Sequence, residues 1–274
     1  MLVFPNAKIN LGLRIHRKRD DGYHDLETVF IPIALTDALE IIRSGQNEKS
    51  PYLPFTLSGL ELPDNPESNL CIRAYSILKR DFPDLPQVRM HLHKVIPSGA
   101  GLGGGSADAA FTLLLLNRMF ALNLDNETLI RYAKELGSDC PFFIINKPCY
   151  ATGRGEQLEE LDLDLSPYRI LIVNPGIHIN TGIAFSHIQP VIPNLSLKEI
   201  IKNPIERWKE DLQNDFEKVI FPKHPEIGGI KELLYRSGAV FASMSGSGST
   251  MYGIFPKDMN PLPAFPGNYF VRLV

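Results

Sequence analysis

One glycine-rich stretch, residues 97–106 with the sequence PSGAGLGGGS, constrains this chain more than any other segment. It runs directly into residues 107–120, whose alanine and leucine content predicts a helix. Glycine adopts positive φ angles and lets a ligand approach the backbone closely. The first turn of a helix has unpaired N–H groups and the positive end of the helix dipole. The stretch therefore predicts a phosphate-binding loop rather than a flexible linker.

Neither of the two standard phosphate-binding loops fits this stretch well. The P-loop pattern requires a lysine at the position of Gly105, so its mechanism is missing. The dinucleotide pattern G-x-G-x-x-G fits Gly99, Gly101 and Gly104, but it should follow a strand that is buried on both faces. Residues 88–95 instead alternate between apolar and polar types, which predicts a strand with one solvated face. We therefore expect residues 97–106 to form a phosphate-binding loop of a third type.

Length and composition predict a globular α+β protein with two domains. A chain of 274 residues suits one large or two modest domains, and 44% hydrophobic residues suffice for a packed core. Residues 156–164 are strongly acidic, and this shift places the expected domains at residues 1–155 and 156–274.

Charge and cysteine content exclude several classes of partner. The net charge of −3 argues against a nucleic-acid partner, and no apolar run approaches the ~20 residues of a membrane span. The N-terminus lacks the pattern of a signal peptide. Three cysteines without metal-site spacing suggest free thiols in a reducing compartment. We therefore expect a cytoplasmic protein with no nucleic-acid or membrane partner.

Hydrophobic periodicity predicts the secondary structure. Residues 44–68 read as a loop around the apolar piece Phe55–Leu57, and Gly137 is expected to end a helix in the left-handed region. The expected strands are 7–13, 26–33, 38–42, 88–95, 142–145, 170–173, 239–244, 251–255 and 269–274. The expected helices are 69–80, 107–120, 127–136, 197–202, 208–219 and 227–237.

A few polar residues stand out against this background. Lys8 and Asn10 lie on the same face of the first strand, where lysine usually faces solvent. Asp139 follows the end of a helix, where aspartate usually caps a turn. Tyr23 and His24 follow a glycine and could simply close a hairpin. The serine- and glycine-rich residues 245–250 are too long for a simple hairpin turn and suggest a second loop around a nucleotide.

Three segments together resemble the three motifs of the GHMP kinase superfamily. They are residues 5–11 (PNAKINL), 97–106 and 245–249 (SGSGS), in the same order and with similar spacing. Residues 17–24 (RKRDDGYH) and 137–143 (GSDCPFF) resemble one branch of the superfamily, which phosphorylates an alcohol linked to cytidine diphosphate. The resemblance covers residues 3–255.

The resemblance implies an N-terminal domain of ribosomal-protein-S5-like fold and a ferredoxin-like C-terminal domain. It implies ATP as the phosphoryl donor, Mg²⁺ as its companion, and transfer to the 2-hydroxyl of a cytidyl-linked methylerythritol in the non-mevalonate isoprenoid pathway. The expected partner is this small molecule, and the expected assembly is a monomer or a weak homodimer. The alternatives are another small-molecule GHMP kinase and a non-catalytic nucleotide-binding relative.

The resemblance also assigns individual residues. The acid that helps to hold magnesium in some relatives of the superfamily has no evident match here, so the metal ligands are unknown. Lys8 and Asp139 match the catalytic lysine and aspartate. The expected ATP-binding residues are Asn69, Lys94, Pro97, Gly99, Gly101, Gly103, Gly104, Gly105 and Ser106. The expected substrate-binding residues are Asn10, Tyr23, His24, Thr181 and Phe185.

Overall fold

The computed structural model describes residues 1–44, 53–61, 69–260 and 263–274, and it divides into two compact units. The first unit comprises Met1–Ala7, Ala34–Ser98 and Gly103–Asn146. The second comprises Lys8–Ile33, Gly99–Leu102 and Lys147–Val274. Both units mix helices and strands, which confirms the predicted α+β class. The predicted boundary after residue 155 refers to the two domains of the family and stays a prediction.

The first unit is built on a four-stranded sheet with the order β1-β4-β6-β5. Strand β5 runs parallel to β6, and the other neighbouring pairs are antiparallel. Every second residue of β6 is buried, so the predicted alternation over residues 88–95 is confirmed. The strands are β1 (Leu2–Val3), β4 (Ala38–Arg43), β5 (Phe55–Gly59) and β6 (Val88–Lys94). The rest of the predicted loop 44–68 falls largely on residues 45–52 and 62–68, outside the described residues.

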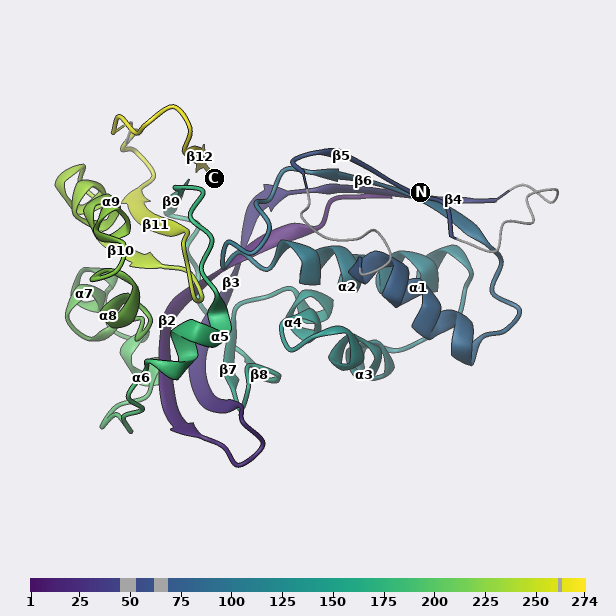
Figure 1. The fold of residues 1–274 in the computed structure, drawn as a ribbon, viewed down its shortest axis with the longest axis horizontal. Helices are drawn as coiled ribbons and strands as arrows, with labels where there is room; N and C mark the ends of the chain where they lie inside the picture. Colours follow the sequence, from purple (N-terminus) through teal and green to yellow (C-terminus); the bar gives the residue numbers. More distant parts are fainter. Residues whose placement is uncertain (45–52, 62–68, 261–262) are drawn as a thin grey trace. The chain divides into compact units, whose positions relative to one another are not determined.

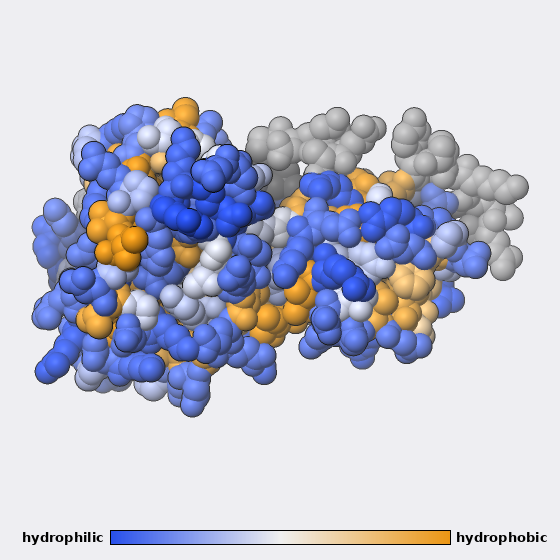
Figure 2. Space-filling model, turned by 90° about the horizontal axis from the view of Figure 1, so that it is seen from below, coloured by the Kyte–Doolittle hydropathy of each residue, from blue (hydrophilic) through white to orange (hydrophobic). Residues whose placement is uncertain are grey.

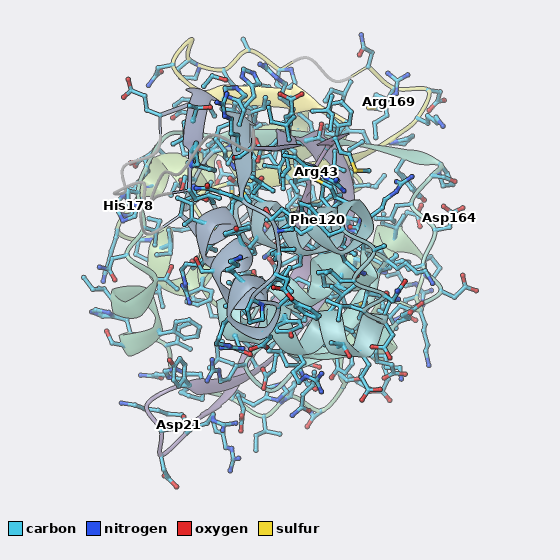
Figure 3. The ribbon with its side chains drawn as sticks, turned by 90° about the vertical axis from the view of Figure 1, so that its right-hand side faces the viewer. Asp21, Arg43, Phe120, Asp164, Arg169 and His178 are labelled. Carbon is cyan, nitrogen blue, oxygen red and sulfur yellow. The ribbon has the colours of Figure 1, made fainter. Side chains whose placement is uncertain are left out.

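Four helices of the first unit lie along one side of this sheet (Figure 1). They are α1 (Leu70–Asp81), α2 (Gly104–Met119), α3 (Asn126–Leu136) and α4 (Cys140–Ile145). Near the C-terminal end of α2, the guanidinium group of Arg43 lies 5.2 Å from the centre of the Phe120 ring (Figure 3). This contact joins the end of β4 to the end of the central helix.

The local sequence explains where these helices begin and end. Asn69 and Asp125 accept hydrogen bonds from backbone N–H groups in the first turns of α1 and α3. Gly137 follows α3 as predicted, but its φ of 169° is extended backbone rather than left-handed. The predicted strand 142–145 is wrong, because these residues belong to α4. A four-residue apolar run cannot distinguish a strand from a buried helix, and Pro141 suits the first helical turn.

The second unit contains two four-stranded sheets. One sheet has the strand order β2-β3-β7-β8, with β2 (Asn6–Lys18), β3 (His24–Thr36), β7 (Cys149–Thr152) and β8 (Gln157–Glu160). Residues 6–7 of β2 and 34–36 of β3 count with the first unit. The order β10-β11-β9-β12 contains β9 (Tyr168–Asn174), β10 (Phe241–Met244), β11 (Met251–Pro256) and β12 (Phe270–Leu273). Asp21 lies at the tip of the turn that joins β2 to β3 (Figure 3).

Short helices accompany the second sheet, and α9 packs against β10 and β11 (Figure 1). The predicted helix 208–219 is wrong as a continuous element, because Leu212–Phe216 interrupts it. Asn214 in this interruption bonds through its side chain to the backbone carbonyls of Met244 and Gly246. The helices are α5 (Thr181–Ser186), α6 (Leu197–Ile200), the 3-10 helix η2 (Ile205–Arg207), α7 (Trp208–Asp211), α8 (Glu217–Ile220) and α9 (Pro225–Arg236).

The surface of the protein is mostly hydrophilic on the face that Figure 2 shows, with apolar side chains in separate patches. Within the described ranges, none of the helices combines the length and apolar character needed to cross a membrane.

Candidate active site

The glycine-rich stretch joins β6 to α2 and turns through three glycines with positive φ. Gly99, Gly101 and Gly103 have φ angles of 62°, 81° and 70°. Helix α2 begins at Gly104, three residues before the predicted start, so the last glycines of the stretch belong to its first turn. The residue that precedes this turn, Gly103, has no side chain with which to cap it. The N–H groups of the turn can therefore bind an anion, as the sequence predicts.

The two glycines at the start of α2 differ in the space around them. A Cβ atom on Gly104 would lie 2.9 Å from Ile96 Cγ2 and 3.3 Å from the ammonium nitrogen of Lys94. A Cβ atom on Gly105 would meet no described atom closer than Leu70 Cδ1, at 4.0 Å. Gly104 therefore lets the helix pack against the end of β6, whereas the backbone at Gly105 is open on its Cβ side.

Asp139 lies next to the first turn of α2. It directly precedes α4, is half-buried and makes no capping hydrogen bond to the helix that it precedes. The following residue, Cys140, has a buried thiol that lies near the hydroxyl of Ser106 in the first turn of α2. Burial raises the pKa of the Cys140 thiol to about 12, so this group is a neutral structural contact. The structure thus brings together the predicted catalytic aspartate and the end of the glycine loop.

Lys94 is placed differently from the other predicted ATP-binding residues. Its side chain is 2% exposed, and Nζ lies 2.5 Å from Asp37 Oδ2 and 2.7 Å from Asp108 Oδ2. Burial acts to lower the pKa of Lys94, but the two carboxylates together raise it above its usual value. The Lys94 ammonium group therefore stays charged and belongs to a buried network beneath the loop. Its predicted contact with ATP stays a prediction.

Asn69 caps the N-terminus of helix α1, in addition to its predicted contact with ATP. Its side-chain oxygen accepts a hydrogen bond of 2.9 Å from the backbone N–H of Cys71 and so begins α1. The amide nitrogen of Asn69 does not take part in this cap. It is the atom of the side chain that can donate to a nucleotide.

Lys8 and Asn10 lie side by side in the second unit, which confirms that they share one face of β2. Lys8 Nζ donates a hydrogen bond of 2.6 Å to Asn10 Oδ1, and it also lies 4.9 Å from the centre of the Phe30 ring. Asn10 Nδ2 donates to Thr28 Oγ1 at 2.8 Å. Both Lys8 and Asn10 are buried, so the usual solvated role of a strand lysine does not apply here. The backbone N–H of Lys8 donates to the carbonyl of Leu102 in the glycine loop.

The second glycine-rich segment packs directly against the first. Ser245 Oγ donates a hydrogen bond of 2.8 Å to the carbonyl oxygen of Gly101, and it accepts one from the N–H of Asn10. Thr250 N–H donates to the Ala100 carbonyl at 3.3 Å. The prediction that residues 245–250 form a second loop beside the nucleotide loop is consistent with this packing, although the bound nucleotide stays a prediction.

Sequence reasoning missed the residues that hold this second segment. Asn214 is 1% exposed, and its Nδ2 donates to the carbonyls of Met244 and Gly246, both at 2.8 Å. Asn174 Nδ2 donates to Thr250 Oγ1 at 2.9 Å. An asparagine within an otherwise amphipathic helical pattern was the available signal, because asparagine is unfavourable in helix interiors.

Tyr23 and His24 stand at the start of β3, after a tight turn. Gly22 has a φ of 83°, and Asp21 accepts a hydrogen bond from the N–H of Tyr23. Tyr23 is 53% exposed, and the guanidinium group of Arg154 lies 3.9 Å from the centre of its ring. Partial burial and the nearby Lys18 lower the pKa of His24, so its imidazole is neutral at pH 7.

Phe185 and Thr181 come from α5 and reach two different groups. The Phe185 ring stacks on His24 with centroids 4.9 Å apart and an interplanar angle of 17°. Thr181 Oγ1 lies 2.9 Å from Ser247 Oγ in the second glycine segment. Phe185 therefore lies beside the predicted site residue His24, and Thr181 lies beside the predicted second loop. The contact of either residue with a substrate stays a prediction. Lys8 and Asp139 belong to different units, and their pairing also stays a prediction.

Comparison with known proteins agrees with this geometry. The model of the GHMP kinase N-terminal domain matches residues 69–147, and that of the GHMP kinase C-terminal domain matches residues 196–262. Together the two models cover just over half of the chain, and the class is therefore that of the GHMP kinases.

Individual relatives indicate which branch of the GHMP kinases the chain belongs to. A 4-diphosphocytidyl-2-C-methyl-D-erythritol kinase of Bacteroides thetaiotaomicron is 54% identical over 94% of this chain and 93% of its own length. A kinase of the same name from Azobacteroides pseudotrichonymphae is 49% identical over 97% of both chains. A crystal structure of 4-(cytidine 5'-diphospho)-2C-methyl-D-erythritol kinase superposes with a TM-score of 0.78 at 32% identity, over 93% of this chain and 90% of that one. The chain belongs to the 4-diphosphocytidyl-2-C-methyl-D-erythritol kinase family.

Proposed function

We propose that the protein transfers the γ-phosphoryl group of ATP to the 2-hydroxyl group of 4-diphosphocytidyl-2-C-methyl-D-erythritol, in the non-mevalonate route to isoprenoid precursors. GHMP kinases use ATP as their donor, and the curated relatives carry the name of this kinase. The observation that carries the proposal is the contact between Ser106 and Cys140. It supports a position for Asp139 near the start of α2, because α4, which Asp139 precedes, packs against α2.

The glycine loop is the proposed site of the ATP phosphates. Phosphoryl transfer depends mostly on positioning and on neutralisation of charge, and backbone N–H groups at a helix start provide both. The N–H groups of residues 101–106 would bind the phosphates, and the open space at Gly105 would admit them. Pro97 and Gly99 shape the first half of this loop, and Gly103 and Gly104 shape the second.

Asp139 and Lys8 are the proposed catalytic residues. Asp139 would accept the proton of the substrate hydroxyl as the oxygen attacks the γ-phosphorus. Lys8 would stabilise the negative charge on the transferred group. The hydrogen bond from Lys8 to Asn10 fixes the direction of the lysine side chain, so its ammonium group needs little rearrangement.

Magnesium is the expected companion of ATP, and it neutralises phosphate charge when it is bound. Within the described residues, no group of three or more His, Cys, Asp or Glu side chains could hold a metal ion. Magnesium is usually held by one or two protein ligands, while phosphates and water supply the rest. Ser106, the hydroxyl residue at the end of the loop, is the proposed protein contact.

Tyr23, His24 and Phe185 are the proposed cytosine site, with Thr181 and Asn10 on the remainder of the substrate. A neutral imidazole presents one donor and one acceptor, which suits the polar edge of a base. The reacting alcohol is small, so binding energy from the remote cytidine can orient its hydroxyl group. A site that pairs with cytosine should reject uracil, whose carbonyl replaces the exocyclic amine.

The test is ADP release from ATP and Mg²⁺ with a panel of alcohols. We expect turnover of the cytidyl substrate and a kcat/KM for the uridyl analogue that is lower by about 100-fold or more. Faster turnover of homoserine, mevalonate or a sugar would assign the chain to another GHMP kinase activity. Absence of turnover with every alcohol, despite ATP binding, would favour the non-catalytic relative.

Two further properties complete the proposal. A cytoplasmic location is supported by Cys71, Cys140 and Cys149, which are all free and buried thiols. A monomer or a weak homodimer is the proposed assembly, to be measured by sedimentation at several protein concentrations.

A further inference from the structure

The glycine loop is connected at both ends to one buried lysine. At its start, the carboxylate of Asp37 accepts hydrogen bonds from the N–H groups of Val95 at 2.6 Å and Ile96 at 2.9 Å. The second carboxylate oxygen of Asp37 accepts a hydrogen bond from Lys94 Nζ. These contacts hold the two residues that lead from β6 into the loop.

At the end of the loop, the same ammonium group reaches α2. Lys94 Nζ donates a hydrogen bond of 2.7 Å to Asp108 Oδ2, and Asp108 is the fifth residue of that helix. Lys94 Nζ also lies under Gly104, where a Cβ atom would come within 3.3 Å of it. One ammonium group therefore bridges the backbone before the loop and the helix after it.

This network is poorly suited to attract phosphate by charge. Two carboxylates surround one ammonium group, and Lys94, Asp37 and Asp108 are at most 3% exposed relative to their full surfaces. Asp108 Oδ1 has no hydrogen-bond partner among the described residues, and burial raises the pKa of Asp108 to about 7 although Lys94 acts to lower it. Direct electrostatic attraction of ATP by Lys94 would be offset by its neighbours. The geometry of the loop is what the network can control.

We infer that Lys94 is a positioning residue that fixes the distance between the start and the end of the phosphate-binding loop by bridging Asp37 and Asp108. This inference rests on the proposed function only in taking ATP as the ligand of the loop. Lys94 acts on ATP through the N–H groups that the loop presents, without touching the nucleotide through its side chain. Sequence reasoning placed Lys94 near ATP but gave no reason to couple it to Asp37 or Asp108.

Asp108→Leu is the most informative variant, because it removes only the hydrogen bond between Lys94 and α2. Leucine has a similar size, and Lys94 keeps its charged partner Asp37, so no buried charge is left unpaired. We expect the dissociation constant for a fluorescent ATP analogue to rise by about tenfold or more, since small misplacements of binding groups are costly. The KM for the cytidyl substrate should stay unchanged.

Two variants separate positioning from general damage to α2. Asp108→Asn still offers Lys94 an acceptor and should restore binding of the ATP analogue to within about threefold of the wild type. Thr112→Val removes a buried hydroxyl one turn further along α2, where Thr112 donates to the Asp108 carbonyl. It should leave binding of the analogue unchanged.

If Asp108→Leu does not fold, the triple variant Lys94→Met/Asp37→Asn/Asp108→Leu removes all three charges while leaving an acceptor for Val95 and Ile96. A raised dissociation constant in the folded variant supports the inference. A wild-type dissociation constant in either variant overturns it, as does an equal loss in Asp108→Leu and Asp108→Asn. The wild-type protein tests the substrate separately: binding of the analogue without phosphorylation of the cytidyl alcohol would overturn the proposed function alone.

Discussion

Ser245 and Gly101 meet with almost no space between them. The Ser245 hydroxyl donates to the Gly101 carbonyl at 2.8 Å, and a Cβ atom on Gly101 would lie 2.0 Å from the Ser245 carbonyl oxygen. Two segments separated by more than a hundred residues thus share one backbone contact. The shape of the phosphate-binding loop depends on the second glycine segment as well as on its own glycines.

Gly101→Ala should therefore damage ATP use. The new methyl group must displace the Ser245 backbone, and alanine disfavours the φ of 81°. We expect kcat/KM for ATP to fall by about 100-fold and the free energy of unfolding to fall by about 1–3 kcal/mol. The matched control is Gly229→Ala in α9, which has open space and should gain up to about 1 kcal/mol. Unchanged ATP kinetics in folded Gly101→Ala would contradict the packing of the two loops.

Asn214→Asp should destabilise the second unit. The buried Nδ2 group donates to two carbonyl oxygens, which a carboxylate would instead repel. We expect a loss of about 2–4 kcal/mol in the free energy of unfolding, measured by urea denaturation. Asn203→Asp is the control, because this exposed asparagine should change stability by less than about 0.5 kcal/mol. Equal stability of the two variants would show that Asn214 does not hold the segment.

Recognition of the substrate should weaken at low pH. Burial and Lys18 lower the pKa of His24, so the folded protein keeps a neutral imidazole above the unfolded value of 6.5. Any stability from neutral His24 is present above that pH and is lost as the pH falls through the lowered folded value. We expect kcat/KM for the cytidyl substrate to be constant from pH 6.5 to 8 and to fall below this range. His24→Gln should lack this fall, and an identical pH profile in the variant would exclude His24 as its cause.

Asp139→Asn should separate chemistry from ATP binding. Loss of a general base lowers rates by about 10²–10⁴-fold, and we expect kcat to fall within this range. The dissociation constant for an ATP analogue should change little, because asparagine has the same shape and α4 keeps its contact between Cys140 and Ser106. If the variant keeps about a third or more of the wild-type kcat, Asp139 is not the base.

Much of this site could be predicted because its signals are local. Glycine spacing identifies the loop between β6 and α2, and alternation identifies β2 with Lys8 and Asn10 on one face. Each of these signals depends on residues that are close together in the chain. The family resemblance then supplied roles that spacing alone could not.

The residues that escaped prediction act over long separations in the sequence. Asp37 holds backbone groups 58 and 59 residues away, and Asn214 holds carbonyls 30 and 32 residues away. No periodicity marks such contacts. The apolar run of α4 resembles a strand because a short stretch of sequence does not show what buries it. In the structure, α4 is buried by packing against α2 and α3.

The most direct test of the central claim is the structure of the product. Purified protein, ATP, Mg²⁺ and 4-diphosphocytidyl-2-C-methyl-D-erythritol would be followed by ³¹P NMR until ADP accumulates. The account predicts one new phosphate monoester on the 2-oxygen of the methylerythritol, with the cytidine diphosphate linkage intact and one ADP formed per product. ADP without a new monoester, or a monoester at another hydroxyl, would contradict it.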